Sequence, residues 1–162
     1  MAYPAIDPLK LRVFPLSERR NLLHLDKETA QAVAASSPAD PAVQRQIDQL
    51  AEKMLAARQK KASIMFTYGA HLIKNGAGSL LNRLVEAGLV THLATQGAGI
   101  IHDWEFSYQG HSGESVRENA PAGTFGAWEQ TGRYLNLAVI VGAADGLGFG
   151  ESIGRMIEED RL

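Results

Sequence analysis

The residues best suited to chemistry are two runs of small side chains, each of which follows a short apolar segment. One run is Thr95–Gly99, which leads into a predicted helix, and the other is Thr67–His71. Small side chains let backbone N–H groups approach an anionic ligand, and a helix N-terminus adds partial positive charge. Ligands of parallel sheets bind beyond the carboxyl ends of the strands, where both runs are expected. The two runs predict a nucleotide or other phosphate site, with tight turns and no ligand as the alternative.

Titratable side chains follow the Thr95–Gly99 run closely, at His102, Asp103 and Glu105, with His111 nearby. Imidazole and carboxylate groups ligate zinc or divide acid and base roles. At helical spacing His102 and Glu105 share one face, whereas Asp103 points about 100° away from His102. Two ligands make a poor metal site, so we predict no metal. A functional role for His102 or Asp103 would instead be to contact a ligand in the adjacent turn. The alternative is that the acidic residues only complement the dipole of the helix N-terminus and have no ligand. His71 is expected beside the other turn, that of the Thr67–His71 run.

A third glycine motif, Gly142–Gly148, fits the GxxxGxG phosphate turn of short-chain dehydrogenases. The sequence ends at Leu162, too soon for the acidic residue that such a turn requires about 20 positions later. Apolar residues at helical spacing over 125–141 predict instead one long helix that the glycines end. We favour the helix.

The elements that position the two turns follow from hydrophobic periodicity and helix signals. Asp40 and Pro41 are typical of a helix start, and Val43, Ile47 and Leu50 begin an apolar stripe. Alternating strands and helices predict a parallel sheet in an α/β domain. In chain order the predicted elements are helix 41–61, strand 63–67, helix 70–87, strand 89–95, a helix from 100, loop 110–123, and helices 125–141 and 149–159.

The composition excludes several classes of protein. The net charge of −2 and the lack of a basic run argue against nucleic acid as a partner. The chain has no cysteine, so disulfides, thiolate catalysis and cysteine-based metal sites are excluded. No secretory signal begins the chain and its longest apolar run, 137–144, is too short to span a bilayer, so we predict a cytoplasmic protein without a membrane partner.

Prolines interrupt the first part of the chain, which predicts an irregular arm over 1–39 with a short helical piece near 27–35. Residues 40–162 then form the α/β domain.

Residues 63–137 resemble the deoxyhypusine synthase family and its bacterial relatives. The order and spacing of several short segments carry the resemblance. These segments are Thr67–Gly76, Leu84–Thr95, Gln96–Gly99, Asp103, Phe106–Gly110 and Arg117–Asn119. The resemblance implies a Rossmann-like, helix-rich α/β fold that binds NAD and assembles as a homotetramer. It also implies aminobutyl transfer from spermidine, a small amine substrate, to a lysine of a translation factor.

The resemblance further implies which residues bind the cofactor: Ala70, His71, Thr95, Gln96, Gly97, Ala98, Gly99, His102 and Asp103. His102 stands where the family has a glutamate, and Ala70 and His71 replace a serine–asparagine pair. The family's polyamine pocket and imine-forming lysine lie in a second half without counterpart here, and Lys74 does not match that lysine. We therefore expect an incomplete Rossmann-like domain that binds NAD, with no catalytic residue assigned.

Two other functions are compatible with the sequence. The chain is a non-catalytic oligomerisation or interaction domain if the turns are structural and helix 40–61 serves subunit contact. Alternatively, it transfers a related amine or amidine group, since acidic residues near the turns suit a cation.

Overall fold

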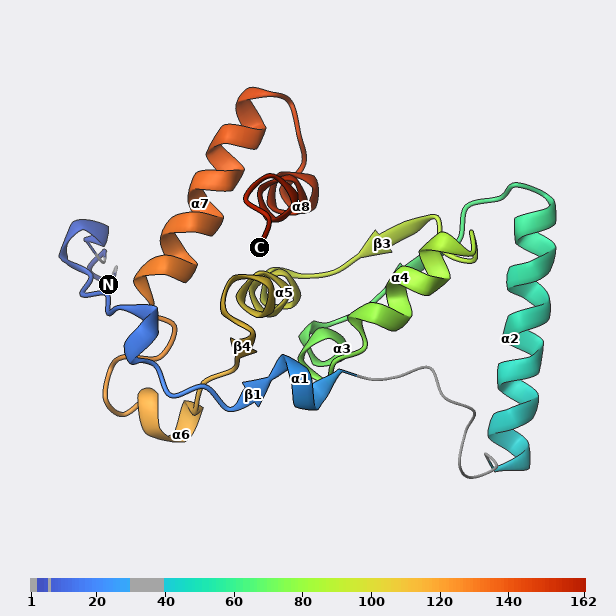
Figure 1. The fold of residues 1–162 in the computed structure, drawn as a ribbon, viewed down its shortest axis with the longest axis horizontal. Coiled ribbons are helices and arrows are strands. Elements are labelled where there is room, and N and C mark those ends of the chain that lie inside the picture. Colours follow the sequence, from blue (N-terminus) through green and yellow to red (C-terminus); the bar gives the residue numbers. More distant parts are fainter. Residues whose placement is uncertain (1–2, 6, 30–39) are drawn as a thin grey trace.

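The structure, a computed structural model, describes residues 3–5, 7–29 and 40–162. It is a helix-rich, mixed α/β fold with a small parallel sheet (Figure 1). Its 3-10 helices and strands are η1 Pro8–Lys10, η2 Leu16–Glu18, β1 Leu23–His24, β2 Met65–Thr67, β3 His92–Ala94 and β4 His111–Ser112. Its α-helices are α1 Leu25–Glu28, α2 Pro41–Gln59, α3 Ala70–Lys74, α4 Gly78–Glu86, α5 Gly97–Gln109, α6 Val116–Asn119, α7 Glu129–Ala144 and α8 Phe149–Glu159.

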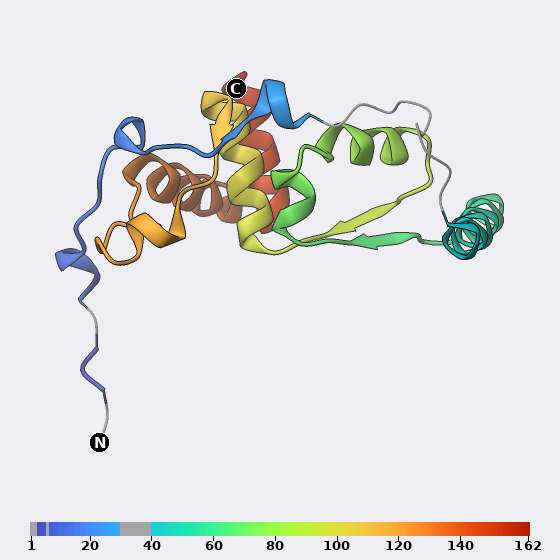
Figure 2. The same cartoon turned by 90° about the horizontal axis from the view of Figure 1, so that it is seen from below.

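The parallel pairing predicted from the alternation of strands and helices is confirmed. β2 and β3 run parallel, with Met65 opposite His92 and Thr67 opposite Ala94. α4 lies over one face of this two-stranded ribbon (Figure 2). Met65 and Leu93 are exposed on the ribbon. Within the described residues the other strand pair, β1–β4, is antiparallel and forms a separate sheet.

The single helix predicted over 70–87 is wrong. The chain leaves α3 after Lys74 and begins α4 at Gly78. Gly76 between them has a φ of 76°, and a Cβ there would meet the carbonyl of Glu28 in α1. The apolar residues keep a helical spacing across this break, so the sequence predicts an unbroken helix. The close approach of α1 to the backbone, which the break accommodates, leaves no mark in that spacing. The helix expected from 100 begins earlier, at Gly97.

Residues 7–29 pack on the part of the chain that follows α2. The Phe14 N–H donates to the carbonyl of Ala127, and the Phe14 carbonyl accepts from the Glu129 N–H, both at 2.8 Å. β1 pairs with β4, and Leu16 is 2% exposed. α1 covers the start of the helical piece predicted near 27–35, and residues 30–39 lie outside the described residues.

The main core joins α5, α7 and α8 to this N-terminal segment. Its buried residues are Leu16, Trp104, Trp128, Leu135, Ala138 and Ile153. Trp104 stacks on Tyr108 with ring centroids 4.7 Å apart. Both tryptophans pack in the interior, since Trp104 is 1% and Trp128 8% exposed.

The segment before the glycine motif at 142–148 is a helix, as predicted, but α7 begins at Glu129 rather than at 125 and continues past Gly142 to Ala144. Gly142 lies inside α7, and Gly148 precedes α8. Val141, the last residue of the apolar spacing that predicted this helix, is exposed. α7 and α8 bend by 108° at their junction, and only taken together do they have the length and apolar character of a membrane span; no single helix among the described residues does.

Replacing two glycines of α7 by alanine is expected to have opposite effects on stability. A Cβ at Gly142 would meet Ser152 Oγ and, at 3.2 Å, the Ser152 backbone Cα, so Gly142→Ala should cost about 1–3 kcal/mol. A Cβ at Gly132 has nothing within 4 Å, so Gly132→Ala should add about 0.5–1 kcal/mol. Urea unfolding measures both. Equal shifts of the two variants would show that α7 and α8 are not in this contact.

Candidate functional site

The two small-residue turns lie side by side at the carboxyl edge of the β2–β3 ribbon. The Tyr68 N–H donates to the Ala94 carbonyl at 3.0 Å, which continues the parallel ladder into the turns. The chain then enters α3 at Ala70 and α5 at Gly97, and these two helices pack against each other (Figure 1). Ala70 and His71 therefore come from one turn and Thr95–Gly99 from its neighbour.

The Thr95–Gly99 turn is an open helix N-terminus. The Gln96 side chain caps α5, its Oε1 accepting the Ala98 N–H at 2.6 Å. A Cβ at Gly97 would have nothing within 4 Å, so the backbone there is open to a ligand. Gly99 is covered, because a Cβ on it would lie 2.5 Å from Thr95 Oγ1. That buried hydroxyl lies beside the Tyr68 phenol and makes no well-aligned hydrogen bond among the described residues.

A large open cleft of about 1100 Å³ lies next to the turns, between α5, α8 and the α3–α4 segment. Tyr68, Leu93, Asp103 and Phe106 are among its lining residues. Of the predicted site residues, all of which the structure describes, Asp103 alone lines this cleft.

Burial changes the proton affinities of two groups in the cleft. It raises the pKa of the Asp103 carboxyl above its ordinary value. Burial, and then the charge of Asp103, raise the pKa of the Tyr68 phenol. The phenol therefore stays protonated around neutral pH and can donate a hydrogen bond to a ligand.

His102 points to the other side of α5. Its Nδ1 lies 2.7 Å from Ser112 Oγ, and that hydroxyl donates to Glu105 Oε2 at 2.6 Å. Because a hydroxyl has one proton to donate, it accepts from His102 Nδ1–H, which leaves Nε2 as the acceptor. Burial lowers the pKa of His102; Glu105 opposes this, while the charges of Lys74, Arg19 and His71 reinforce it. The ring is therefore neutral at neutral pH.

Glu105 is the centre of a buried polar network. Arg19 Nη1 and Nη2 donate to its two oxygens, each at 2.7 Å, and the Thr131 hydroxyl donates to Oε1 at 2.9 Å. The side chains of Arg19 and Glu105 are 3% and 1% exposed. Burial by itself raises the pKa of Glu105, but the hydrogen bonds from Arg19, Ser112 and Thr131 and the charge of Arg19 outweigh it, so the pKa lies below its ordinary value.

This network corrects one sequence interpretation and adds residues that the sequence did not reveal. His102 and Glu105 do share a face of α5, as predicted. Glu105 does not serve as a surface acid near a helix N-terminus, however, because it is buried against Arg19. Arg19 lies 86 positions away, and no local pattern marks it as the partner.

Histidines elsewhere on the chain do not extend the site. His111 packs edge-on against His24 across the β1–β4 pair, with ring centroids 4.6 Å apart. Residues 3–5, 7–29 and 40–162 hold no group of three or more His, Cys, Asp or Glu side chains that could bind a metal ion.

Comparisons with known proteins returned no match. No protein-family model fits the chain, and neither the curated proteins nor the solved structures include one with significant similarity to it. The geometry of the turns, the cleft and the buried network is therefore the basis for a functional argument.

Proposed function

We propose that this chain is a cytoplasmic, deoxyhypusine-synthase-like protein that binds NAD at an incomplete Rossmann-like sheet edge. One observation carries the proposal: two small-residue turns leave adjacent parallel strands together, and one of them opens directly into α5. Dinucleotides bind at this edge of a parallel sheet, with a phosphate at a helix N-terminus.

The residues present fit such a ligand. The open backbone at Gly97 allows close approach of the pyrophosphate, which would take the Ala98 N–H in place of the Gln96 side chain. The buried Thr95 hydroxyl, which makes no well-aligned hydrogen bond among the described residues, offers a further donor. Asp103, in the adjoining cleft, is suited to accept hydrogen bonds from ribose hydroxyls. Ala70 and His71 would border the bound nucleotide from the neighbouring turn, whereas His102, expected from the resemblance to bind it, faces Ser112 on the other side of α5.

The proposal is for binding rather than for a complete reaction. NAD, when bound, supplies a hydride acceptor. Transfer of an aminobutyl or related amine group also requires a lysine that forms an imine, and after Lys61 the sequence holds only Lys74. Lys74 lies on α3, close enough to lower the pKa of neutral His102 by its charge. A small amine substrate and a homo-oligomeric assembly, a tetramer by resemblance, remain part of the proposal.

A titration with NADH, followed by its fluorescence, tests the proposal. Gly97→Asp should weaken binding about fivefold or more, because one like charge within about 4 Å of a phosphate costs about 1–4 kcal/mol. Gly150→Asp is the matched control, since Gly150 is also exposed in the first turn of a helix and has nothing within 4 Å of a Cβ. Absence of binding at millimolar NADH, or equal affinities of the two variants, would overturn the proposal.

The second candidate is an interaction domain without a cofactor. The apolar stripe of α2 favours it, because Val43, Ile47 and Leu50 are about half exposed on a helix without a buried residue. Sedimentation with and without NAD separates the candidates: assembly that depends on NAD supports the first, and assembly indifferent to NAD supports the second.

A further inference from the structure

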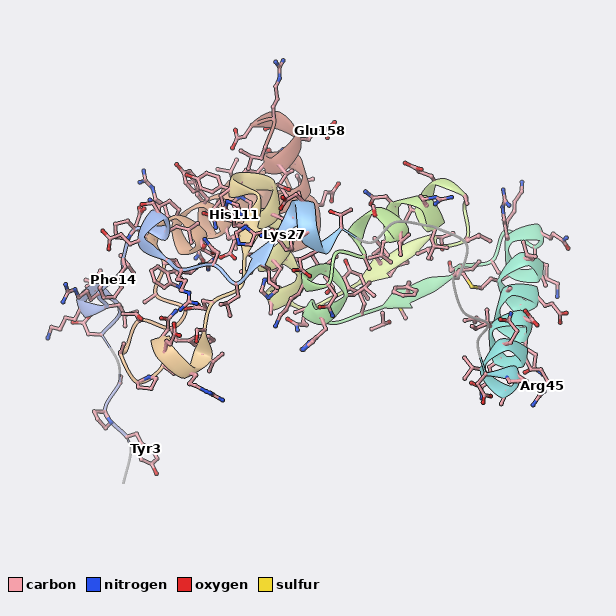
Figure 3. All side chains as sticks on the ribbon, turned by 60° about the horizontal axis from the view of Figure 1, so that its bottom comes forward. Tyr3, Phe14, Lys27, Arg45, His111 and Glu158 are labelled. Atoms are coloured by element: carbon pink, nitrogen blue, oxygen red, sulfur yellow. The ribbon has the colours of Figure 1, made fainter. Side chains whose placement is uncertain are left out.

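α2 stands apart from the rest of the molecule with most of its large apolar residues exposed, although Met54 near its end is half-buried. Figures 1 and 2 both place it at the opposite end from α5, α7 and α8. Val43 is 48%, Ile47 50% and Leu50 58% exposed. Its polar side chains, including the labelled Arg45, project from the same isolated helix (Figure 3). Most of the stability of a helix in a protein comes from packing of its apolar face, so the stripe on this 19-residue helix requires a cover.

The stripe has the spacing of a coiled-coil seam. Val43, Ile47, Leu50 and Met54 follow one another at steps of four, three and four, which are the a and d positions of successive heptads. Arg45 and Glu52 fall at f, on the opposite face of the helix. We propose that α2 pairs with α2 of a second copy of this chain, and that the two helices run antiparallel.

Charge along α2 favours a second copy and fixes its direction. The first half, 40–50, carries two carboxylates and one arginine, whereas the second half, 51–61, carries one carboxylate and four cations. An antiparallel pair places each basic half beside an acidic one. A parallel pair places the basic halves together and brings Lys53, at a g position, against Arg58 at e of its partner. The antiparallel arrangement avoids that repulsion.

The antiparallel arrangement also places apolar residues of one helix opposite apolar residues of the other. Val43 then faces Met54 of the partner, and Ile47 faces Leu50 of the partner, so every a residue meets a d residue. The contact is two-fold symmetric and self-complementary, which gives a closed dimer rather than an open chain of subunits. The pairing does not require NAD, because α2 contributes no residue to the turns; assembly of a tetramer that depends on NAD would be a separate step beyond this dimer.

Sedimentation equilibrium of the full chain tests whether the stripe forms the dimer. The unsubstituted chain should dimerise, and Leu50→Glu should weaken the dimer at least tenfold by burying a charge in the seam. Leu55→Glu is the matched control, because Leu55 is 48% exposed on the same helix but lies at a b position outside the seam. A monomeric unsubstituted chain, a stable dimer of Leu50→Glu, or equal weakening by both substitutions would overturn the proposal.

Disulfide formation tests the direction of the pair, since the chain has no cysteine of its own. In an equimolar mixture of Val43→Cys and Met54→Cys, oxidation should give mainly the mixed dimer, separable by mass. Predominant self-linkage of each variant would show a parallel pair and refute the antiparallel arrangement. Linkage of neither would show that α2 does not contact a second α2. Circular dichroism confirms that each variant keeps its helix content.

Discussion

Arg19→Met is expected to remove about 3–5 kcal/mol of the unfolding free energy, a large part of the total of about 5–15 kcal/mol for a domain. The substitution keeps most of the apolar stem but leaves the Glu105 carboxylate buried without its cation. Ser112 and Thr131 still donate hydrogen bonds to it, but neither supplies charge. Arg19 also lies over the Trp128 ring, 5.7 Å from its centroid, and that contact is lost as well. Urea unfolding followed by far-ultraviolet circular dichroism measures the change.

Arg20→Met is the matched control for this prediction. Arg20 is the next residue and pairs with Glu118 at 3.4 Å, but the two side chains are 78% and 57% exposed. Solvent screens such pairs, so the control should change stability by about 1 kcal/mol at most. Similar losses for the two arginine variants would show that the Arg19–Glu105 pair is not buried as described.

The pH dependence distinguishes an unpaired charge from a general loss of packing. In the unsubstituted chain the folded-state pKa of Glu105 lies below its unfolded value. Its contribution is therefore fully present above the ordinary glutamate pKa, about 4.3, and is lost as the pH falls through the folded pKa. In Arg19→Met, burial instead raises the Glu105 pKa, and protonation relieves the penalty. The difference between the two proteins should shrink on acidification; a constant difference would indicate lost packing alone.

The fold could be predicted from the sequence wherever local signals agreed with packing. Asp40 and Pro41 begin α2 as expected, the Asp40 side chain accepting the Ala42 N–H at 2.7 Å. The apolar spacing before Gly142 correctly favoured a helix over a strand. The break at Gly76 was missed because its cause is the backbone of Glu28, far away in the sequence. From the local sequence alone, a glycine among apolar residues at helical spacing is indistinguishable from a glycine that a helix tolerates.

The candidate site, too, could be predicted where local signals agreed with packing and not where distant residues meet. The parallel ribbon, which adjacent apolar segments predicted, brings the two turns together. The 100° separation of His102 and Asp103 on α5 also holds, since Asp103 lines the cleft and His102 contacts Ser112. The role of Glu105 could not be predicted, because burial of a carboxylate depends on a cation supplied by distant chain. Arg19 lies in a segment interrupted by prolines, and nothing in its local sequence indicates that it pairs with a buried carboxylate.

The buried network and the turns are connected through α5. Its first turn opens to the proposed nucleotide, and Glu105 lies further along the same helix, locked to Arg19. A helix N-terminus binds an anion well only when the helix is held rigidly, because a site that shifts loses the geometry of its donors. We therefore expect Arg19→Met to weaken NADH binding as well as stability, although Arg19 is not among the residues proposed to contact the ligand.

Trp104 is the second residue whose loss should have a large effect, because it holds α5 against the core. The side chain is 1% exposed, stacks on Tyr108 and lies 5.9 Å from Tyr134 between ring centroids. Trp104→Ala removes these contacts and leaves a cavity, for which about 3–5 kcal/mol is expected. Trp104→Phe keeps a ring in the stack and removes an indole N–H that has no hydrogen-bond partner among the described residues, so it should cost less than half as much.

Urea unfolding followed by circular dichroism orders the Trp104 variants. Tyr108→Ala is the control, because Tyr108 belongs to the same stack but is 39% exposed and fills less of the interior. Its loss should be clearly smaller than that of Trp104→Ala. Where Trp104→Ala does not fold at 25 °C, the phenylalanine variant still carries the test, since it should unfold at lower urea than the unsubstituted chain. A Trp104→Ala variant within about 1 kcal/mol of the unsubstituted chain would mean that α5 is anchored elsewhere, and that the turn at Gly97 does not owe its position to this core.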